Sequence, residues 1–328
     1  MMERLVGLEE IRKAREALPR VIRRTPILPL ARDSAEVGRE QLFLKAENLQ
    51  VTGAYKPRAA FTVINFQSPE ERARGVVLSS SGNFAQGFAY AGACLGVPIV
   101  VVMMDRTSPY KVDATRGYGA EVVFCGNDPL ARQPKVAEIA QQRGMTGIDT
   151  WESHMVIAGH ASIGLEIIED FPDVETILVP VSSGGLAAGV ATAVKLSRPD
   201  IRVIGVQPQQ ANAAYVSLQR GEPTTIDYWD SLADGLSAVR PGTIPFQHLQ
   251  KYLDEIVLIA EEEIAAAFRT LLFRAKLMGE PAGTVAPAAY LAGKVAVDRK
   301  TAALLSGGNV TESVAQTMLR MSAPGGQS

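Results

Sequence analysis

Short runs rich in β-branched residues alternate with longer alanine-rich amphipathic stretches along most of this sequence. This alternation is typical of strands joined by crossover helices in a parallel sheet, and it predicts an α/β fold. The predicted strands cover residues 76–78, 99–103, 121–124, 176–181, 202–206, 256–259 and 301–305. The predicted helices between them include 84–95, 110–118, 130–142, 186–197 and 261–278.

The length of 328 residues bounds the number of domains. At roughly 150 residues per domain, the chain is long enough for two domains with a sizeable buried core. The part before Asp149 and the part after it each contain a full series of predicted strands and helices. Open α/β sheets bind ligands beyond the carboxyl ends of their strands, so we expect a site in a cleft between two sheets.

Composition excludes several classes of protein. Hydrophobic residues make up 47% of the chain, charged residues 21%, and the formal net charge is −2, which is typical of a globular protein and excludes a polybasic nucleic-acid-binding protein. The longest apolar stretch, 95–104, contains Gly96 and Pro98 and is shorter than the roughly 20 residues that span a bilayer. Because the charged N-terminal segment lacks a secretion signal, we predict a cytoplasmic protein with no membrane or nucleic-acid partner.

The cysteines agree with that location. Cys94 and Cys125 lie in separate apolar segments and form no Cys-x-x-Cys motif. They are expected to be free, buried thiols of a protein from a reducing compartment, and neither a disulfide nor a zinc cluster is expected.

Three strand-end loops combine glycine with small polar residues. They are Ser79-Ser80-Ser81-Gly82-Asn83, Ser182-Ser183-Gly184-Gly185-Leu186 and Ser306-Gly307-Gly308-Asn309. In each, glycine lets the backbone approach a ligand and a helix is expected to follow, so that free N–H groups and the helix dipole would face an anion. One such loop could be an ordinary turn, but the three together favour an anion site.

The sequence around these loops lacks the motifs of nucleotide binding. The loop at 183–189 does not contain Gly-x-Gly-x-x-Gly, and the next predicted strand ends in Gln207-Pro208, where a ribose-binding acid would be expected. A Walker loop is also absent from the sequence. A dehydrogenase or another nucleotide enzyme is therefore disfavoured, and a small phosphate monoester is the expected ligand.

Lys56 is a candidate nucleophile. It lies between Gly53 and Pro57, ahead of an apolar run, which indicates the entry of a helix beside a pocket. A lysine desolvated at such a place has a depressed pKa and can react as an amine. The alternative is an ordinary solvated surface lysine, which is what most lysines are.

Several motifs around these residues resemble a known family. They are residues 44–50 (LKAENLQ), 53–56, 80–83, 109–111, 114–115, 119–122, 183–185, 280–283 and 306–310. Together they are similar to the serine/threonine dehydratases and serine racemases, which are fold-type II pyridoxal-phosphate enzymes related to the tryptophan synthase β chain. The match runs in order from about residue 25 to residue 310.

The resemblance implies a two-domain architecture with pyridoxal 5'-phosphate between the domains. Residues 1–49 and 148–328 would form the large domain, residues 50–147 would form a small domain inserted in it, and each would hold an open, mostly parallel sheet flanked by helices. The resemblance also implies a homo-oligomer, expected to be a homodimer.

The resemblance carries roles onto matching positions. Lys56 would form the Schiff base, with Tyr55 packed near the ring where the family usually has Phe. Asn83 would bind the ring hydroxyl, and Ser306 would meet the pyridine nitrogen. The phosphate would be held by Ser182, Ser183, Gly184, Gly185 and Leu186. The substrate would be bound by Ser80, Ser81, Gly82, Asn83 and Phe84, and Ser81 would be either a second acid/base or only an anchor.

The implied reaction is β-elimination by an ammonia-lyase that converts a β-hydroxy amino acid to a 2-oxo acid and ammonia. The chemistry of Ser306 agrees, because a hydroxyl partner leaves the pyridine nitrogen largely neutral and so favours elimination over transamination. Racemisation and β-replacement are alternatives within the family, and a non-catalytic cofactor-binding protein is an alternative of another class.

Two departures from the family concern the substrate and the metal. Phe84 replaces the usual His, and 151–162 lacks the usual Asp-Asp-Pro and Gly-Gln-Gly-Thr, so a bulkier or differently charged substrate is possible, with His154 and His160 as candidate contacts. At the position where many members bind a divalent cation, Gln207 and Ala213 replace both carboxylates. Because Mg²⁺ and Ca²⁺ need anionic oxygen ligands, we predict no divalent metal site.

Overall fold

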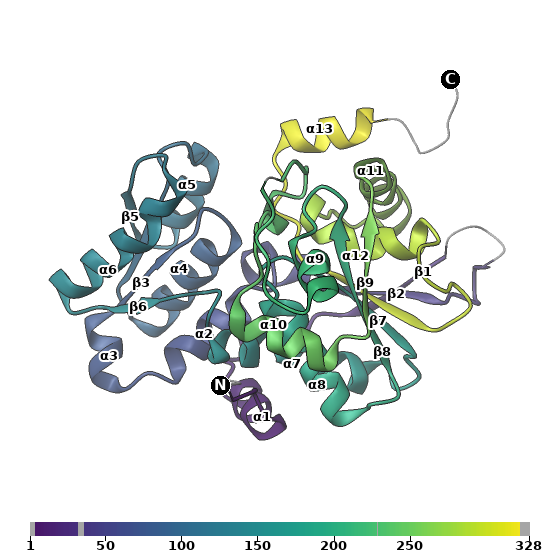
Figure 1. Ribbon diagram of the computed structural model, residues 1–328, viewed down its shortest axis with the longest axis horizontal. Helices are drawn as coiled ribbons and strands as arrows, with labels where there is room; N and C mark the ends of the chain where they lie inside the picture. The colour runs from purple at the N-terminus through teal and green to yellow at the C-terminus, as the bar shows by residue number, and fades with distance from the viewer. Residues whose placement is uncertain (1–3, 32–35, 228, 322–328) are drawn as a thin grey trace.

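The computed structural model describes residues 4–31, 36–227 and 229–321, and these form two sheets flanked by helices (Figure 1). The larger sheet has the order β1 (Ile27–Leu30), β2 (Leu42–Ala46), β10 (Thr301–Leu305), β7 (Thr176–Pro180), β8 (Arg202–Pro208) and β9 (Glu255–Ile259). The smaller sheet has the order β5 (Glu121–Phe124), β4 (Ile99–Met103), β3 (Val76–Ser79) and β6 (Thr146–Ile148). Neighbouring strands are parallel except for β1 and β2. The predicted α/β fold is confirmed.

The helices pack against both faces of these sheets. They are α1 (Leu8–Glu16), α2 (Pro57–Asn65), α3 (Pro69–Arg74), α4 (Asn83–Leu95), α5 (Pro109–Gly117), α6 (Arg132–Arg143), α7 (His154–Asp170), α8 (Gly185–Ser197), α9 (Ala213–Arg220), α10 (Thr243–Tyr252), α11 (Glu261–Thr270), α12 (Pro281–Leu291) and α13 (Glu312–Arg320). In Figure 1, α3 to α6 surround the smaller sheet on the left, and α7 and α8 lie beneath the larger sheet while α11 lies above it.

Alternation of side chains along the strands explains why each sheet has two hydrophobic cores. Ile177 and Val179 of β7 pack with residues of α7 and α8, whereas Leu178 packs with α11 and α12 on the opposite face. In the smaller sheet, Val76 faces α2 and α4, and Val77 faces α6. Both sheets are thus covered on both faces, as expected for parallel strands that read as continuous apolar runs.

All the predicted strands are present, and three further strands were not predicted. β1 contains Pro29, β2 contains the charged Lys45, and β6 is a short Thr-Gly-Ile segment. Proline, charge and glycine each weaken the sequence signal of a strand. These strands form because neighbouring strands supply their hydrogen bonds.

One predicted helix is wrong in its extent. The segment 261–278 does not form a single helix, because α11 ends at Thr270 and a π-helical turn, Leu271–Ala275, follows. Lys276 then adopts a left-handed conformation with φ of 60°, and the Leu277 N–H donates to the Leu271 carbonyl oxygen. No glycine or proline marks this end, so a periodic pattern could not reveal it.

The expected burial of the cysteines is also wrong. Both thiols are free, but Cys94 is exposed and Cys125 is only partly buried. Cys94 lies in the last turn of α4, where an apolar surrounding sequence does not decide which side faces solvent.

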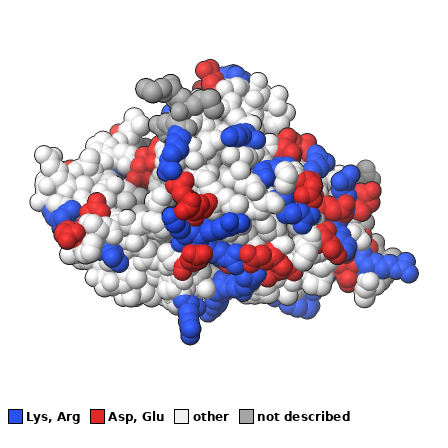
Figure 2. Space-filling model, turned by 90° about the horizontal axis from the view of Figure 1, so that it is seen from below, with Lys and Arg blue, Asp and Glu red and all other residues white. Residues whose placement is uncertain are grey.

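The surface carries charge of both signs. On the face shown in Figure 2, basic and acidic side chains are interspersed rather than gathered into a patch of one sign. The described part of the chain also has exposed ion pairs, such as Arg143 with Glu121 and Arg202 with Glu255. No helix in the described part of the chain is both long enough and apolar enough to cross a membrane.

The strands of the smaller sheet all lie between residues 76 and 148. Its last strand ends one residue beyond the predicted small domain, 50–147. Helix α2 packs against α4, which covers the smaller sheet, and against α7, which covers the larger sheet. It therefore connects the two sheets and their helices. Lys56 is the residue immediately before this helix.

Candidate active site

Two loops from distant parts of the chain lie side by side and position Lys56. The Gly308 N–H donates to the Gly53 carbonyl oxygen at 2.9 Å, and the Tyr55 N–H donates to the Ser306 carbonyl oxygen at 3.2 Å. Ala54 also forms an isolated antiparallel bridge with Gly307. The 306–309 loop therefore acts as a short partner strand for the chain that leads into Lys56.

The lysine loop has an unusual backbone that this neighbour supports. Thr52 and Gly53 both have positive φ, 62° and 72°, and a left-handed threonine is strained. The Asn309 side-chain amide donates to the Thr52 carbonyl oxygen at 2.7 Å. A Cβ on Gly53 would collide with the Asn309 side chain, so glycine is required there.

The third polar loop joins this cluster through Asn83, the first residue of α4. Asn309 Nδ2 donates to Asn83 Oδ1 at 2.9 Å, and Asn83 Nδ2 donates to a carboxylate oxygen of Glu280 at 2.6 Å. The structure therefore brings Asn83 together with the lysine loop and the 306–309 loop.

Lys56 is held between aromatic rings. Its Nζ lies 2.6 Å from the Tyr55 hydroxyl, 4.4 Å from the centre of the Tyr55 ring and 4.1 Å from the centre of the Phe84 ring. Burial lowers the pKa of Lys56 to about 7, and the nearby Glu280 carboxylate partly opposes this lowering. Residue 56 as a whole is partly exposed, and its amine is desolvated.

Glu280 is a candidate site residue that sequence reasoning did not single out. It lies at the N-cap of α12 and is 9% exposed. Burial and the charge of Asp234 raise its pKa to about 7, against the effects of the Asn83 hydrogen bond, Lys111 and Lys56. The available signals were the 280–283 motif and a single acid between Gly279 and Pro281, just after the predicted helix 261–278.

The 182–186 loop has the geometry of an anion site. Gly184 adopts φ of 105°, and a Cβ there would lie 3.0 Å from Pro245 and 3.1 Å from Leu249. Gly185 begins α8, so the first N–H groups of that helix lack intrahelical partners and can bind an anion. The Leu186 side chain packs in the core, so only the backbone of Leu186 could contact a ligand at this loop.

The two serines of this loop are partly committed to holding it. The Ser182 hydroxyl accepts from the Ala238 N–H at 3.3 Å, and the Ser183 carbonyl oxygen accepts from the Gly242 N–H at 2.9 Å. These contacts fix the loop against the segment that leads into α10. We predict that backbone N–H groups are the main anion ligands of this loop.

The 80–84 loop is ordered by its own serines. The Ser80 hydroxyl accepts from the N–H groups of Gly82 and Ala85 at 3.3 and 3.2 Å, and so it caps α4. The Ser81 hydroxyl pairs with the Thr107 hydroxyl at 3.0 Å, and no contact joins Ser81 to Lys56 in the described structure. Space is open at the Cβ position of Gly82.

The two candidate histidines lie in different surroundings. His160, in α7, packs against Tyr55 and Phe84, with ring centres 4.8 and 5.7 Å apart. His154 instead makes a 2.7 Å hydrogen bond with the carbonyl oxygen of Arg4 at the exposed start of α7. Only His160 is therefore placed beside Lys56 by these contacts.

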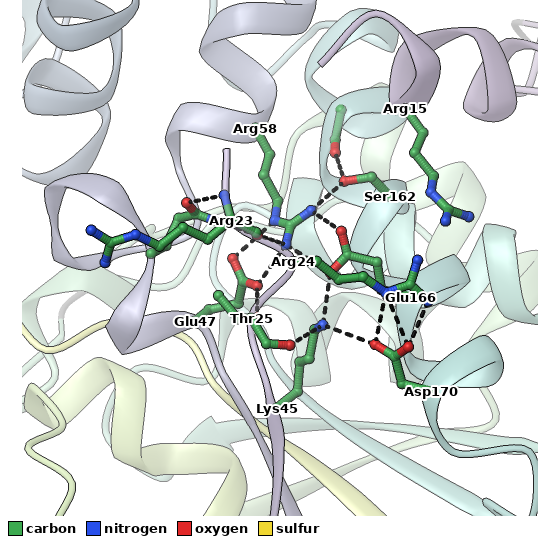
Figure 3. Close-up of polar contacts among 12 residues, drawn as sticks. Arg15, Arg23, Arg24, Thr25, Lys45, Glu47, Arg58, Ser162, Glu166 and Asp170 are labelled. Carbon is green, nitrogen blue, oxygen red and sulfur yellow. Dashed lines mark hydrogen bonds and ion pairs between the residues drawn. The ribbon is translucent and has the colours of Figure 1, made fainter. Parts of the chain in front are cut away.

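A buried network of charges lies next to the lysine loop (Figure 3). Arg58, near the start of α2, bonds Glu47 at 2.9 Å and Glu166 of α7 at 2.7 and 2.8 Å. Lys45 of β2 bonds Glu166 at 2.7 Å, and Thr25 bonds Glu47. Burial opposes ionisation of Glu47, but Arg58 keeps its pKa below the ordinary value. This network fixes α2 against α7.

The predicted absence of a divalent metal site concerns Gln207, which is fully buried. Its side-chain amide donates to the carbonyl oxygens of Val181 and Ala211 at 3.3 and 3.2 Å, and its Oε1 accepts from the Tyr215 N–H at 2.8 Å. An amide that directs N–H groups at these carbonyls does not fit Mg²⁺ or Ca²⁺, which need oxygen ligands. Within the described ranges, no three His, Cys, Asp or Glu side chains gather into a metal-binding group.

Comparisons with known proteins agree with this geometry. A family model described as pyridoxal-phosphate dependent enzyme matches residues 18–307. The chain is 41% identical to an L-threonine ammonia-lyase of Geobacter sulfurreducens over 301 residues, which are 92% of this chain and 75% of that protein.

Solved structures are similar over nearly the whole chain. The processed form of threonine deaminase isoform 2 from Solanum lycopersicum superposes with a TM-score of 0.88 at 29% identity, covering 98% of this chain and 96% of that one. A maize serine racemase superposes with a TM-score of 0.90 at 29% identity, covering 96% and 97% of the two chains. The fold is thus similar to that of both threonine-deaminating and racemising proteins.

Proposed function

The chain belongs to the family of pyridoxal-phosphate-dependent enzymes, as a lyase of the dehydratase type, and we propose that its substrate is L-threonine. The reaction would eliminate the β-hydroxyl group as water, and hydrolysis would then give 2-oxobutanoate and ammonia. The names of its relatives support threonine: the Geobacter protein is an L-threonine ammonia-lyase, and a Staphylococcus aureus protein of 37% identity is a catabolic L-threonine dehydratase.

The residues at the site fit pyridoxal phosphate. Gly184 and Gly185 form a cradle that a Cβ on Gly184 would crowd, and the amino end of α8 suits a phosphate group. Lys56 supplies a desolvated amine, and Ser306 and Asn83 lie on the loops beside it. We propose that the Gly184 and Gly185 backbone holds the phosphate and that Lys56 binds the aldehyde carbon. Ser306 would contact the ring nitrogen, and Asn83 would contact the ring hydroxyl.

In the proposed mechanism, the protein supplies a base and orients the substrate. Bound pyridoxal phosphate would provide an electron-withdrawing ring that stabilises negative charge on the substrate's α-carbon. Lys56 Nζ would take the α-proton, and a pKa of about 7 makes its neutral form available near neutral pH. The Tyr55 hydroxyl at 2.6 Å holds Nζ in place.

The substrate's α-carboxylate would bind at the amino end of α4. Ser80 caps this end, and the helix dipole favours an anion there. Phe84 lies in the first turn of α4 and also borders Lys56, so a carboxylate bound at this helix end would place the α-carbon toward the amine.

The observation that carries the proposal is the Lys56 amine, desolvated between the Tyr55 and Phe84 rings, on a loop that contacts the glycine-containing 306–309 loop. The test is to incubate the holoenzyme with L-threonine and to measure 2-oxobutanoate and ammonia. Lys56→Ala should abolish both turnover and the borohydride-stabilised attachment of the cofactor to the chain. Conversion of L-serine to D-serine without ammonia release would instead indicate a racemase.

We further propose a cytoplasmic homodimer. The two free thiols support a reducing compartment. The dimer rests on the family resemblance, and light scattering of the purified protein tests it directly.

A further inference from the structure

His160 is a buried side chain with little hydrogen bonding. It is 1% exposed, and apart from a contact with the Gly185 backbone neither ring nitrogen has a hydrogen-bond partner within the described part of the chain. Buried polar atoms are rarely left in this state because their lost hydration is not replaced. The arrangement therefore indicates that a ligand completes the hydrogen bonding of this imidazole.

The other two histidines of the chain show what a structural histidine looks like here. His248 uses Nε2 to accept from the Val6 N–H at 3.0 Å, and its Nδ1 lies 2.9 Å from the Ile244 carbonyl oxygen. His154 pairs with the Arg4 carbonyl oxygen. His160 alone among the three is without such contacts.

The position of His160 indicates which ligand it faces. Its ring packs on Tyr55 and Phe84, the same rings that border Lys56. On another side, Nδ1 lies 3.9 Å from the Cβ position of Gly185, which begins α8. His160 is thus located between the reactive amine and the predicted phosphate loop.

The surroundings of His160 keep its imidazole neutral. Burial, Lys56 and Arg58 all lower the pKa of His160 well below its ordinary value, against a contact with the Gly185 backbone. The imidazole is therefore neutral, with one N–H to donate. Phosphate oxygen accepts such a hydrogen bond, and the amino end of α8 attracts the same group.

We propose that His160 is a ligand of the phosphate group, donating an imidazole N–H to the anion held by the 182–186 loop. This inference rests on the proposed function only for the identity of the cofactor. The substrate carboxylate is a less suitable partner, because its expected place is the amino end of α4 rather than that of α8.

The test compares pyridoxal phosphate with pyridoxal, which lacks the phosphate. Apoprotein is titrated with each compound, and with inorganic phosphate alone, for wild type, His160→Leu and His160→Gln. His160→Leu should weaken pyridoxal phosphate and inorganic phosphate by roughly tenfold to a hundredfold, the range for a hydrogen bond to a charged group. It should leave pyridoxal affinity unchanged, and His160→Gln, which keeps an N–H donor, should recover part of the loss.

The thermal stability of the apoprotein gives a readout that a structural histidine would move in the opposite direction. His160→Leu should not lower the apoprotein melting temperature, because it removes two unsatisfied buried atoms. His248→Leu is the control and should lower it, because it breaks two hydrogen bonds. If His160→Leu does not fold, His160→Met replaces it in every titration.

Equal weakening of pyridoxal and pyridoxal phosphate, or no weakening of either, would overturn the role of His160. A failure of the proposed function gives a different result. If the wild type does not deaminate L-threonine but its phosphate affinity still depends on His160, the substrate proposal is refuted and the role of His160 as a phosphate ligand stands. If the wild type deaminates L-threonine but its phosphate affinity does not depend on His160, the substrate proposal stands and the role of His160 is refuted.

Discussion

Lys56 and Glu280 show how burial shifts the pKa values of two opposite groups toward each other, with the charge of Asp234 adding to the shift of Glu280. Desolvation favours the neutral form of each, so it lowers the pKa of the amine and raises that of the carboxyl group, both to about 7. Their mutual attraction opposes both shifts. Two groups that titrate near neutral pH at one site are suited to acid and base roles.

The covalent attachment of pyridoxal phosphate to apoprotein should follow the neutral fraction of Lys56. Its rate should rise with pH through a midpoint near 7, because only the deprotonated amine attacks the aldehyde. In Glu280→Gln, loss of the negative charge that raises the pKa of Lys56 should move this midpoint to lower pH. Stopped-flow absorbance over a range of pH measures both midpoints, and a midpoint near that of a free lysine would contradict the desolvation argument.

At the level of elements, two helix-entry loops combine rigid backbone with side chains that are already committed. Gly184 is left-handed and closely packed, and Ser182 is bound to Ala238. The loop after β8 is held by Gln207. We expect ligand binding at the 182–186 loop to depend on backbone geometry more than on the identity of its hydroxyl side chains.

Gly184→Val should weaken pyridoxal phosphate binding by about tenfold or more, because a β-branched residue at φ of 105° is strained and distorts the N–H cradle. Ser183→Ala is the matched control and should have little effect, since the backbone N–H remains. Cofactor titration of both apoproteins measures the difference. Equal losses would show that the serine hydroxyl is the main ligand.

The Gln207 loop should not respond to divalent cations. Its amide already joins the carbonyl oxygens of Val181 and Ala211, so EDTA or added Mg²⁺ should leave wild-type activity and melting temperature unchanged. Gln207→Glu replaces both N–H donors with acceptors, and it should lower the melting temperature and make it rise again with Mg²⁺. Activation of the wild type by Mg²⁺ would contradict the assignment.

At the scale of the whole molecule, the network around Arg58 connects segments that are distant in sequence. Arg58 lies in the expected small domain, while Glu47 and Glu166 lie in the two parts of the expected large domain (Figure 3). All three side chains are nearly inaccessible to solvent. By contrast, the Lys111–Asp234 pair that joins α5 to the Asp234–Leu236 turn is exposed and contributes little to stability.

Arg58→Met should lower the free energy of unfolding by about 3–5 kcal/mol, because it leaves the buried Glu47 carboxylate without its cation and leaves Glu166 with Lys45 alone. Arg143→Ala is the control: it breaks the exposed pair with Glu121 and should cost no more than about 1 kcal/mol. Urea denaturation of both apoproteins measures these values. Similar small losses in the two variants would show that the buried network does not stabilise the junction.

Local pattern was sufficient to predict much of the architecture. Strands such as β4 and β7 are continuous buried runs, and each glycine-containing loop lies at the end of such a strand, so the α/β fold and the location of Lys56 could be inferred without coordinates. β1, β2 and β6 could not, because their stability comes from neighbouring strands rather than from their own residues.

The sequence by itself determined the alternation of seven strands with helices, the glycine loops and the choice of Lys56 as candidate, since these depend on residue type and short-range spacing. Only the tertiary structure decided the surroundings of Glu280 and His160 and the pairing of Arg58 with Glu47 and Glu166. Burial and contact between distant segments set the energy of a charged or polar group. Neither property is present in a linear pattern, and both arise only when the chain folds.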